Sequence, residues 1–293
     1  MTRGDLDGLT CAILLHEVEP IDEVVLAHPK DVQDGKVDIT SNDILANLPY
    51  DSRAGMWFDH HSSQASEAER PEGFKGAYSI APSAARVIAD HYKSPKFQHY
   101  RTLLDETDKL DAAQLTMDEV RHPDGWILLG LTLDPRTGLG GFRDYFQKLI
   151  TLGRQQPVDQ ILQDPEVAER VRRVREENRE FLHHLEQVAK LDKNVIYMDV
   201  RGMKNLPAGN RFLVYTIYMR GNVSMRVADG LAGKFISIQV GHSIFNRTCK
   251  TNVGELMAKW GGGGHRGAGT CQPTMDVAED AIKDILETLK ANG

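Results

Sequence analysis

The chain has 293 residues, of which 41% are hydrophobic and 26% are charged, and its formal net charge is −7. This mixture is typical of a soluble globular protein with room for two domains. The acidic charge argues against an extended basic track for long nucleic acids, and no stretch approaches the roughly 20 apolar residues that a membrane span needs.

Short apolar runs alternate with helical patterns through the first 150 residues. Such alternation predicts an α/β domain with a mostly parallel sheet. The apolar runs predict short buried strands, and the three- to four-residue periodicity predicts helices. The predicted strands are 24–27, 37–40 and 56–58, and the predicted helices are 9–18, 80–92 and 98–110.

A long segment at 165–191 contains no glycine and no internal proline, and its apolar residues recur every three or four positions. We expect it to be a helix that leads out of the first domain. Beyond it, a smaller α+β domain is predicted, with strands at 195–200, 212–219, 222–227 and 234–240 and helices near 253–260 and 277–291. The predicted organisation is therefore a first domain at 1–164, a connecting helix at 165–191 and a second domain at 192–293.

The first candidate for chemistry is the pair Asp5 and Asp7, which stand one residue apart directly ahead of a predicted helix. Two carboxylates in such a turn can bind hard cations, although a solvated turn explains an isolated pair equally well. A calcium-binding EF-hand loop is excluded, because Arg3 and Leu14 occupy its first and twelfth ligand positions.

A stronger signal follows the apolar run 56–58, where Asp59, His60 and His61 come in succession. In open α/β sheets, ligands bind just beyond the carboxyl ends of the strands. Imidazole suits transition metals, and a carboxylate commonly orients a ligating imidazole. An acid and two imidazoles at a strand end therefore predict a metal-dependent active site.

Two acids accompany the predicted strand at 37–40. Asp43 lies just past that strand, where a ligand is expected, whereas Asp38 lies within it. We favour Asp43 as the functional residue and leave Asp38 as the alternative. A further pair, Asp108 and Asp111, shares one face of a predicted helix, but acidic helix ends are common and this pair alone indicates little.

A glycine-rich segment at 261–269 contains six glycines among nine residues. Its glycines match the GxGxxG spacing of dinucleotide-binding folds, but a helix rather than a strand is predicted before it, so a redox function is disfavoured. No Lys-Ser/Thr pair follows, which excludes a P-loop. We expect a loop whose backbone approaches a ligand closely and presents His265 and Arg266 to it.

Taken in order, these motifs resemble those of the DHH phosphoesterases that carry a DHH-associated C-terminal domain. The resemblance rests on Asp5-x-Asp7-Gly8, Asp43, Asp59-His60-His61, Asp108 and the glycine-rich segment, and it covers nearly the whole chain. Within that family the chain most resembles the exopolyphosphatase-like and oligoribonuclease or pAp-phosphatase-like branch.

The resemblance implies two Mn²⁺ ions, with Asp43 as the bridging ligand and Asp5 on one side of it. His61 is expected to meet the substrate phosphate while Asp59 braces the site. One metal site is expected to be weak, because Arg3 stands where many family members have a histidine ligand. The implied residues are the catalytic Asp59, His60 and His61, the metal ligands Asp5, Asp7, Asp43, His60 and Asp108, and the substrate-binding Arg3, Arg247, Gly263, Gly264, His265 and Arg266.

The implied activity is hydrolysis of small phosphodiesters or phosphomonoesters by metal-activated water, on short oligonucleotides, pAp or cyclic dinucleotides. An exopolyphosphatase is one alternative, and a non-catalytic nucleotide-binding regulator with an impaired metal site is another. Three scattered cysteines and the absence of a signal-peptide pattern predict a cytoplasmic location. The sequence leaves the oligomeric state open and is compatible with a homodimer.

Overall fold

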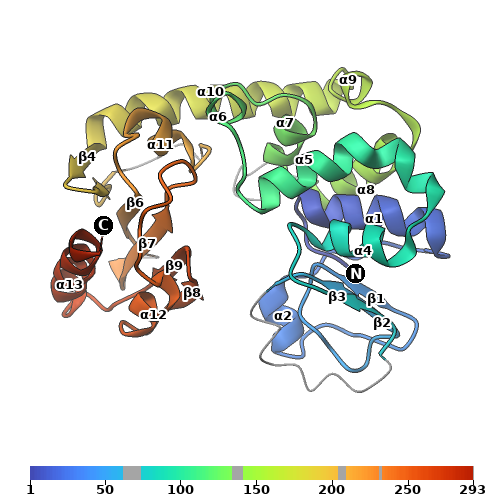
Figure 1. The fold of residues 1–293 in the computed structure, drawn as a ribbon, viewed down its shortest axis with the longest axis horizontal. Coiled ribbons are helices and arrows are strands. Elements are labelled where there is room, and N and C mark those ends of the chain that lie inside the picture. Colours follow the sequence, from blue (N-terminus) through green and yellow to red (C-terminus); the bar gives the residue numbers. More distant parts are fainter. Residues whose placement is uncertain (62–73, 134–140, 204–208, 231–232, 293) are drawn as a thin grey trace. The chain divides into compact units, whose positions relative to one another are not determined.

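The computed structural model describes residues 1–61, 74–133, 141–203, 209–230 and 233–292 (Figure 1). Contacts divide the chain into two compact units, and the division falls within the long helix α10 (Pro165–Val188). The first unit comprises Met1–Leu115 and Pro123–Val174, and the second comprises Thr116–His122 and Arg175–Gly293. The domain limits derived from the sequence stay a prediction, but the fold class, an α/β domain followed by a smaller α+β domain, is confirmed.

The first unit is built on a parallel sheet of strands β1 (Ile44–Ala46), β2 (Met56–Asp59) and β3 (Gly76–Tyr78), in that order. Side chains alternate across it, as a pleated sheet requires. Ala46 and Phe58 face the main core, whereas Leu45 and Trp57 face a smaller apolar cluster that also contains Val32 of helix α2. The sheet is thus covered on both faces, which is typical of parallel sheets.

Helices α1 and α4 pack over the main-core face of this sheet, opposite to α2. Helix α1 contacts β1, and α4 contacts both β2 and β3 (Figure 1). Gly8 lets the start of α1 lie close to the backbone of Arg3, because a Cβ at Gly8 would lie 1.9 Å from the carbonyl oxygen of Arg3. The helices are α1 (Leu6–Val18), α2 (Pro29–Gln33), α4 (Ala84–Tyr92), the 3₁₀ helix η1 (Pro95–Tyr100), α5 (Arg101–Asp111), α7 (Gly125–Leu131), α8 (Phe142–Gln155) and α9 (Val158–Ile161).

Two strand predictions for this unit are wrong. The segment 37–40 is not a strand, because a turn follows it and the strand begins only at Ile44. Ile39 is nevertheless buried in the smaller apolar cluster, which explains the apolar pattern. The segment 24–27 forms no strand, and its β-pairing is limited to an isolated bridge between Leu26 and Thr2. Thr2 forms a second isolated bridge with Ala46. Asp43 therefore precedes a strand instead of following one.

The second unit contains a mixed six-stranded sheet with the order β4-β5-β6-β7-β9-β8. One face is apolar and packs against helices α12 and α13, burying residues such as Val223, Met225 and Ile238. The elements are α6 (Met117–Arg121), β4 (Ala189–Asp192), β5 (Val195–Asp199), α11 (Leu213–Ile217), β6 (Val223–Asp229), β7 (Ile236–His242), α12 (Val253–Ala258), β8 (Gly263–His265), β9 (Ala268–Cys271) and α13 (Ala278–Ala291).

Two predictions for the second unit are also wrong. The expected strand at 212–219 is the short helix α11, since a short apolar run has no periodicity that separates a buried strand from a buried helix. The expected glycine loop is instead a β-hairpin of β8 and β9. Gly264 has φ 154°, and a Cβ there would lie 2.2 Å from the carbonyl oxygen of Ala268. The glycines therefore allow the close contact between the two strands.

No helix among the described residues is both long enough and apolar enough to cross a membrane. The longest of them, α10, carries charged residues throughout its length.

Candidate functional site

Asp7 lies in the first turn of α1, and its carboxylate is 1% exposed. The backbone N–H groups of Ala84 and Ala85, at the N-terminus of α4, each donate a hydrogen bond of 2.9 Å to it. Burial, followed by the nearby charge of Asp5, raises the pKa of Asp7 to about 7. The helix N-terminus thus holds this buried carboxylate in one orientation, and a cation beside it would favour the charged form.

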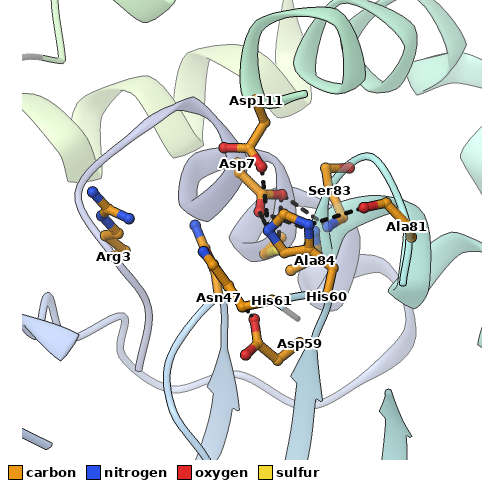
Figure 2. A network of polar contacts seen from close by, with 12 residues as sticks. Arg3, Asp7, Asn47, Asp59, His60, His61, Ala81, Ser83, Ala84 and Asp111 are labelled. Atoms are coloured by element: carbon orange, nitrogen blue, oxygen red, sulfur yellow. Dashed lines mark hydrogen bonds and ion pairs between the residues drawn. The ribbon is translucent and has the colours of Figure 1, made fainter. Parts of the chain in front are cut away.

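His60 faces Asp7 from the carboxyl end of β2, and Asp111 from the end of α5 completes the group (Figure 2). The Nε2 atom of His60 lies 3.2 Å from Asp111 Oδ2 and 3.8 Å from Asp7 Oδ2. Its Nδ1 lies 3.0 Å from the carbonyl oxygen of Ala81. A carbonyl only accepts, so Nδ1 carries the hydrogen and Nε2 presents a lone pair.

This arrangement, the Asp7–His60–Asp111 cluster, fits a bound cation. Burial lowers the pKa of His60, which keeps its imidazole neutral. Its buried Nε2 has no hydrogen-bond partner among the described residues, despite the proximity of Asp111. A nitrogen lone pair and two carboxylates that face one another repel unless a positive charge lies between them. Oxygen ligands with one imidazole and no thiolate suit a hard or borderline divalent ion.

Asp59 and His61 form a second pair beside this cluster. His61 Nδ1 lies 2.8 Å from Asp59 Oδ1, and Asp59 is 1% exposed. This hydrogen bond raises the pKa of His61, so the ring is protonated more readily than a free histidine. The hydroxyl of Tyr78 donates to the His61 carbonyl oxygen at 3.0 Å. The Asp59 contact orients the ring, and the Tyr78 contact holds the backbone of His61.

Asp5 caps the N-terminus of α1, and its Oδ1 accepts from the backbone N–H of Gly8 at 2.9 Å. The same oxygen accepts from the side-chain amide of Asn47 at 3.0 Å. Arg3 forms an ion pair with the other oxygen, at 3.0 Å from Nε to Oδ2. Asp5 is therefore surrounded by one charged and two neutral donors.

Besides Asp5, the predicted ligands Asp43 and Asp108 lie outside the Asp7–His60–Asp111 cluster. Asp43 Oδ2 accepts from the backbone and the hydroxyl of Thr40, at 2.7 and 2.8 Å, in the turn before β1. Asp108 accepts from Ser83 Oγ at 2.6 Å and from Arg86 Nε at 2.7 Å. Their assignment as metal ligands stays a prediction, but both carboxylates are engaged in other contacts.

Two residues near the candidate site, Asp111 and Asn47, were not predicted from the sequence. Asp111 shares a helix face with Asp108, and the family resemblance points to Asp108 instead of Asp111. Asn47 lacks a sequence signal because the apolar pattern predicts the strand at 37–40, whereas β1 is Ile44–Ala46. Once β1 is known to end at Ala46, Asn47 occupies the position just past the strand, where ligands gather.

The predicted substrate-binding residues, apart from Arg3, belong to the second unit. Gly263, Gly264 and His265 form strand β8, and the exposed Arg266 lies at the hairpin turn. Arg247 is exposed on the loop that follows β7, and its Nε donates to the carbonyl oxygen of Ile244 at 3.0 Å. The hairpin is anchored by hydrogen bonds from the backbone of His242 to Gly267 and from Val253 to Arg266.

No family model matches the chain, and no curated protein matches it. Among solved structures, the pGpG-specific phosphodiesterase PggH of Vibrio cholerae is 40% identical with a TM-score of 0.86, covering 100% of this chain and 98% of that one. The DHH domain of a member of a family of ribosomal proteins is 13% identical, with a TM-score of 0.52 and coverages of 98% and 85%. RecJ of Thermus thermophilus in complex with Mn²⁺ is also 13% identical, with a TM-score of 0.53 and coverages of 100% and 52%. The last two likenesses concern the fold alone.

Proposed function

Because this chain belongs to the DHH family of phosphoesterases, we propose that it is a metal-dependent hydrolase that cleaves the phosphodiester bond of short linear nucleotides such as pGpG. The observation that carries the proposal is the Asp7–His60–Asp111 cluster. Its imidazole nitrogen faces two carboxylates and has no hydrogen-bond partner among the described residues. The similarity to PggH along the whole chain supports the choice of a dinucleotide over pAp or a cyclic dinucleotide.

We assign the cation to Asp7, His60 and Asp111, with Asp5 beside them. A bound divalent cation lowers the pKa of a coordinated water toward neutrality and offsets the charge of the phosphoryl oxygens. Mn²⁺ is our proposed ion, because carboxylates combined with one imidazole suit it.

The protein residues have separate tasks in this proposal. Asp7 stays oriented because two backbone N–H groups hold it, and His60 stays oriented because the Ala81 carbonyl accepts from its Nδ1. His61, held by Asp59, offers its other ring nitrogen as a donor to a phosphate oxygen. In the second unit, His265, Arg266 and Arg247 are proposed to bind the part of the substrate away from the scissile bond.

The test uses the purified chain after exhaustive chelation. We expect no conversion of pGpG to GMP until Mn²⁺ is added back, with chromatography as the measurement. Asp7→Asn should abolish the restored activity, whereas Asp90→Asn, an exposed acid on α4, should leave it unchanged. Full turnover after chelation would exclude the metal-dependent mechanism.

The same assay separates the alternatives. The ion pair between Arg3 and Asp5 favours a regulator with an impaired metal site as the second candidate. That candidate predicts nucleotide binding without release of GMP at any metal concentration. Phosphate release from polyphosphate, with pGpG left intact, would instead indicate an exopolyphosphatase. The cytoplasmic location and the homodimer stay predictions.

A further inference from the structure

Asn47 occupies an unusual position at the carboxyl edge of the first unit's sheet. It follows β1 directly, and the pairing of Ala46 with Phe58 sets it beside Asp59 at the end of β2. Its φ is 56°, in the left-handed region that asparagine tolerates better than most residues. Its backbone N–H donates to the carbonyl oxygen of Phe58 at 3.1 Å, so the sheet holds it there.

The side chain of Asn47 is 1% exposed and has one satisfied end and one unsatisfied end. Nδ2 donates to Asp5 Oδ1 at 3.0 Å. Because a carboxylate at this position only accepts, the amide nitrogen must face Asp5 and the amide oxygen must face away. That oxygen has no hydrogen-bond partner among the described residues, although buried amide oxygens are ordinarily paired.

Asn47 Oδ1 and His60 Nε2 are both buried acceptors without a hydrogen-bond partner among the described residues. They come from the ends of the neighbouring strands β1 and β2, and both side chains belong to the polar network drawn in Figure 2. An amide oxygen is a suitable ligand for a hard divalent cation. It differs from a carboxylate in carrying no charge.

We propose that Asn47 is a neutral oxygen ligand for a cation on the Asp5 side of the site, and that its amide nitrogen also positions Asp5. This inference rests on the proposed function. Arg3 already offsets the charge of Asp5, so the Asp5 side has little net negative charge. The Asp7–His60–Asp111 cluster has two carboxylates and an imidazole. The chain therefore binds two cations with unequal affinity, and Asn47 sets the weaker one.

The experiment measures Mn²⁺ binding to the chelated full-length protein by calorimetry, with electron paramagnetic resonance to count bound ions. Asn47→Gly removes the amide and accepts the positive φ without strain. We expect it to weaken the lower-affinity site at least about tenfold and to leave the tighter site unchanged. Asn47→Asp adds a negative charge and should tighten the lower-affinity site by a similar factor.

Asn42→Gly is the matched control, because Asn42 is an exposed asparagine in the turn just before β1 and should bind Mn²⁺ as the wild type does. If Asn47→Gly fails to fold, Asn47→Asp still decides, since it keeps the size and the backbone preference of the residue. Unchanged affinities in Asn47→Asp and in any folded Asn47→Gly would overturn the inference and leave the hydrolase standing, provided that the wild type cleaves pGpG. A wild type that neither binds Mn²⁺ nor cleaves pGpG would remove the proposed function itself.

Discussion

At the scale of single residues, two acids of one helix have different hydrogen-bond and ion-pair partners. Asp108 and Asp111 are three positions apart on α5, yet their surroundings differ. Asp108 is held by Ser83 and by an ion pair with Arg86, whereas Asp111 lies 3.2 Å from the imidazole of His60. The same residue type thus stabilises the fold in one place and faces the candidate metal centre in the other.

The two acids of α5 should therefore respond differently to the same substitution. Asp111→Asn is expected to weaken Mn²⁺ binding at least about tenfold and to lower turnover of pGpG, with little change in stability. Asp108→Asn should lower the free energy of unfolding by about 1–3 kcal/mol, because a charge-assisted contact is lost, and should spare metal affinity. Calorimetric metal titration and thermal unfolding measure the two effects, and the reverse pattern would show that Asp108 is the ligand.

Asp43 provides a second test at this scale. The family resemblance assigns it the bridging position, for which Asp43→Ala should cost several orders of magnitude in turnover. Its two hydrogen bonds with Thr40, in the turn before β1, favour a structural role. We therefore expect Asp43→Ala to cost about 1 kcal/mol of stability and to change turnover less than tenfold. A loss of a thousandfold or more, with the metal content reduced, would restore the bridging assignment.

At the scale of elements, the N-terminus of α4 connects the core to the site. Ser83 caps the helix by accepting from the backbone N–H of Arg86 at 3.0 Å, and it is fully buried. The backbone N–H groups of Ala84 and Ala85, which follow Ser83, donate hydrogen bonds to Asp7. The positive end of the helix dipole favours this carboxylate. Helix α4 thus orients a candidate ligand, Asp7, that belongs to another helix.

Loss of this cap should affect both stability and metal binding. Ser83→Ala is expected to cost about 1–2 kcal/mol in the free energy of unfolding and to weaken Mn²⁺ binding, because the first turn of α4 no longer holds Asp7 firmly. Ser94→Ala is the control, since Ser94 caps the 3₁₀ helix η1 through a longer hydrogen bond of 3.3 Å. Chemical denaturation and metal titration of both variants test the idea, which fails if the metal affinity of Ser83→Ala equals that of the wild type.

At the scale of the whole molecule, the two units contain different parts of the proposed machinery. The candidate metal ligands belong to the first unit, whereas Arg247, His265 and Arg266 belong to the second. The net charge of −7 provides little attraction for long strands. From this separation along the chain we propose a division between chemistry in the first unit and substrate selection in the second.

This division predicts a preference for short substrates. We expect two- to five-nucleotide substrates to be cleaved faster than a 24-mer, and His265→Ala to raise the KM for pGpG while the metal content stays constant. His183→Ala, an exposed histidine on α10 of the same unit, serves as the control. Steady-state kinetics on both lengths provide the measurement. Equal cleavage of the 24-mer by the wild type, with an unchanged KM in His265→Ala, would contradict the division.

The sequence alone determined the family, the fold class and six helices, because these depend on local patterns. These helices are α1, α4, α5, α10, α12 and α13. Residues Asp59, His60 and His61 follow an apolar run and predict a site from the sequence alone. The glycine-rich segment predicts a second motif, although its hairpin form was not predicted. Hydrophobic periodicity is a property of residues close in sequence, and it can therefore be detected without the tertiary structure.

Only the tertiary structure decided which polar residues meet. The limits of β1 depend on its pairing with β2, which is separated from it in sequence. Because β1 lies later in the chain than the predicted strand, Asn47 and not Asp43 follows it at the sheet edge. The choice between Asp108 and Asp111 depends on Arg86 and His60, which approach α5 from other elements. Side-chain partners depend on packing between segments that are distant in sequence. A local pattern therefore predicts candidate site residues, and only the tertiary structure shows which of them contact one another.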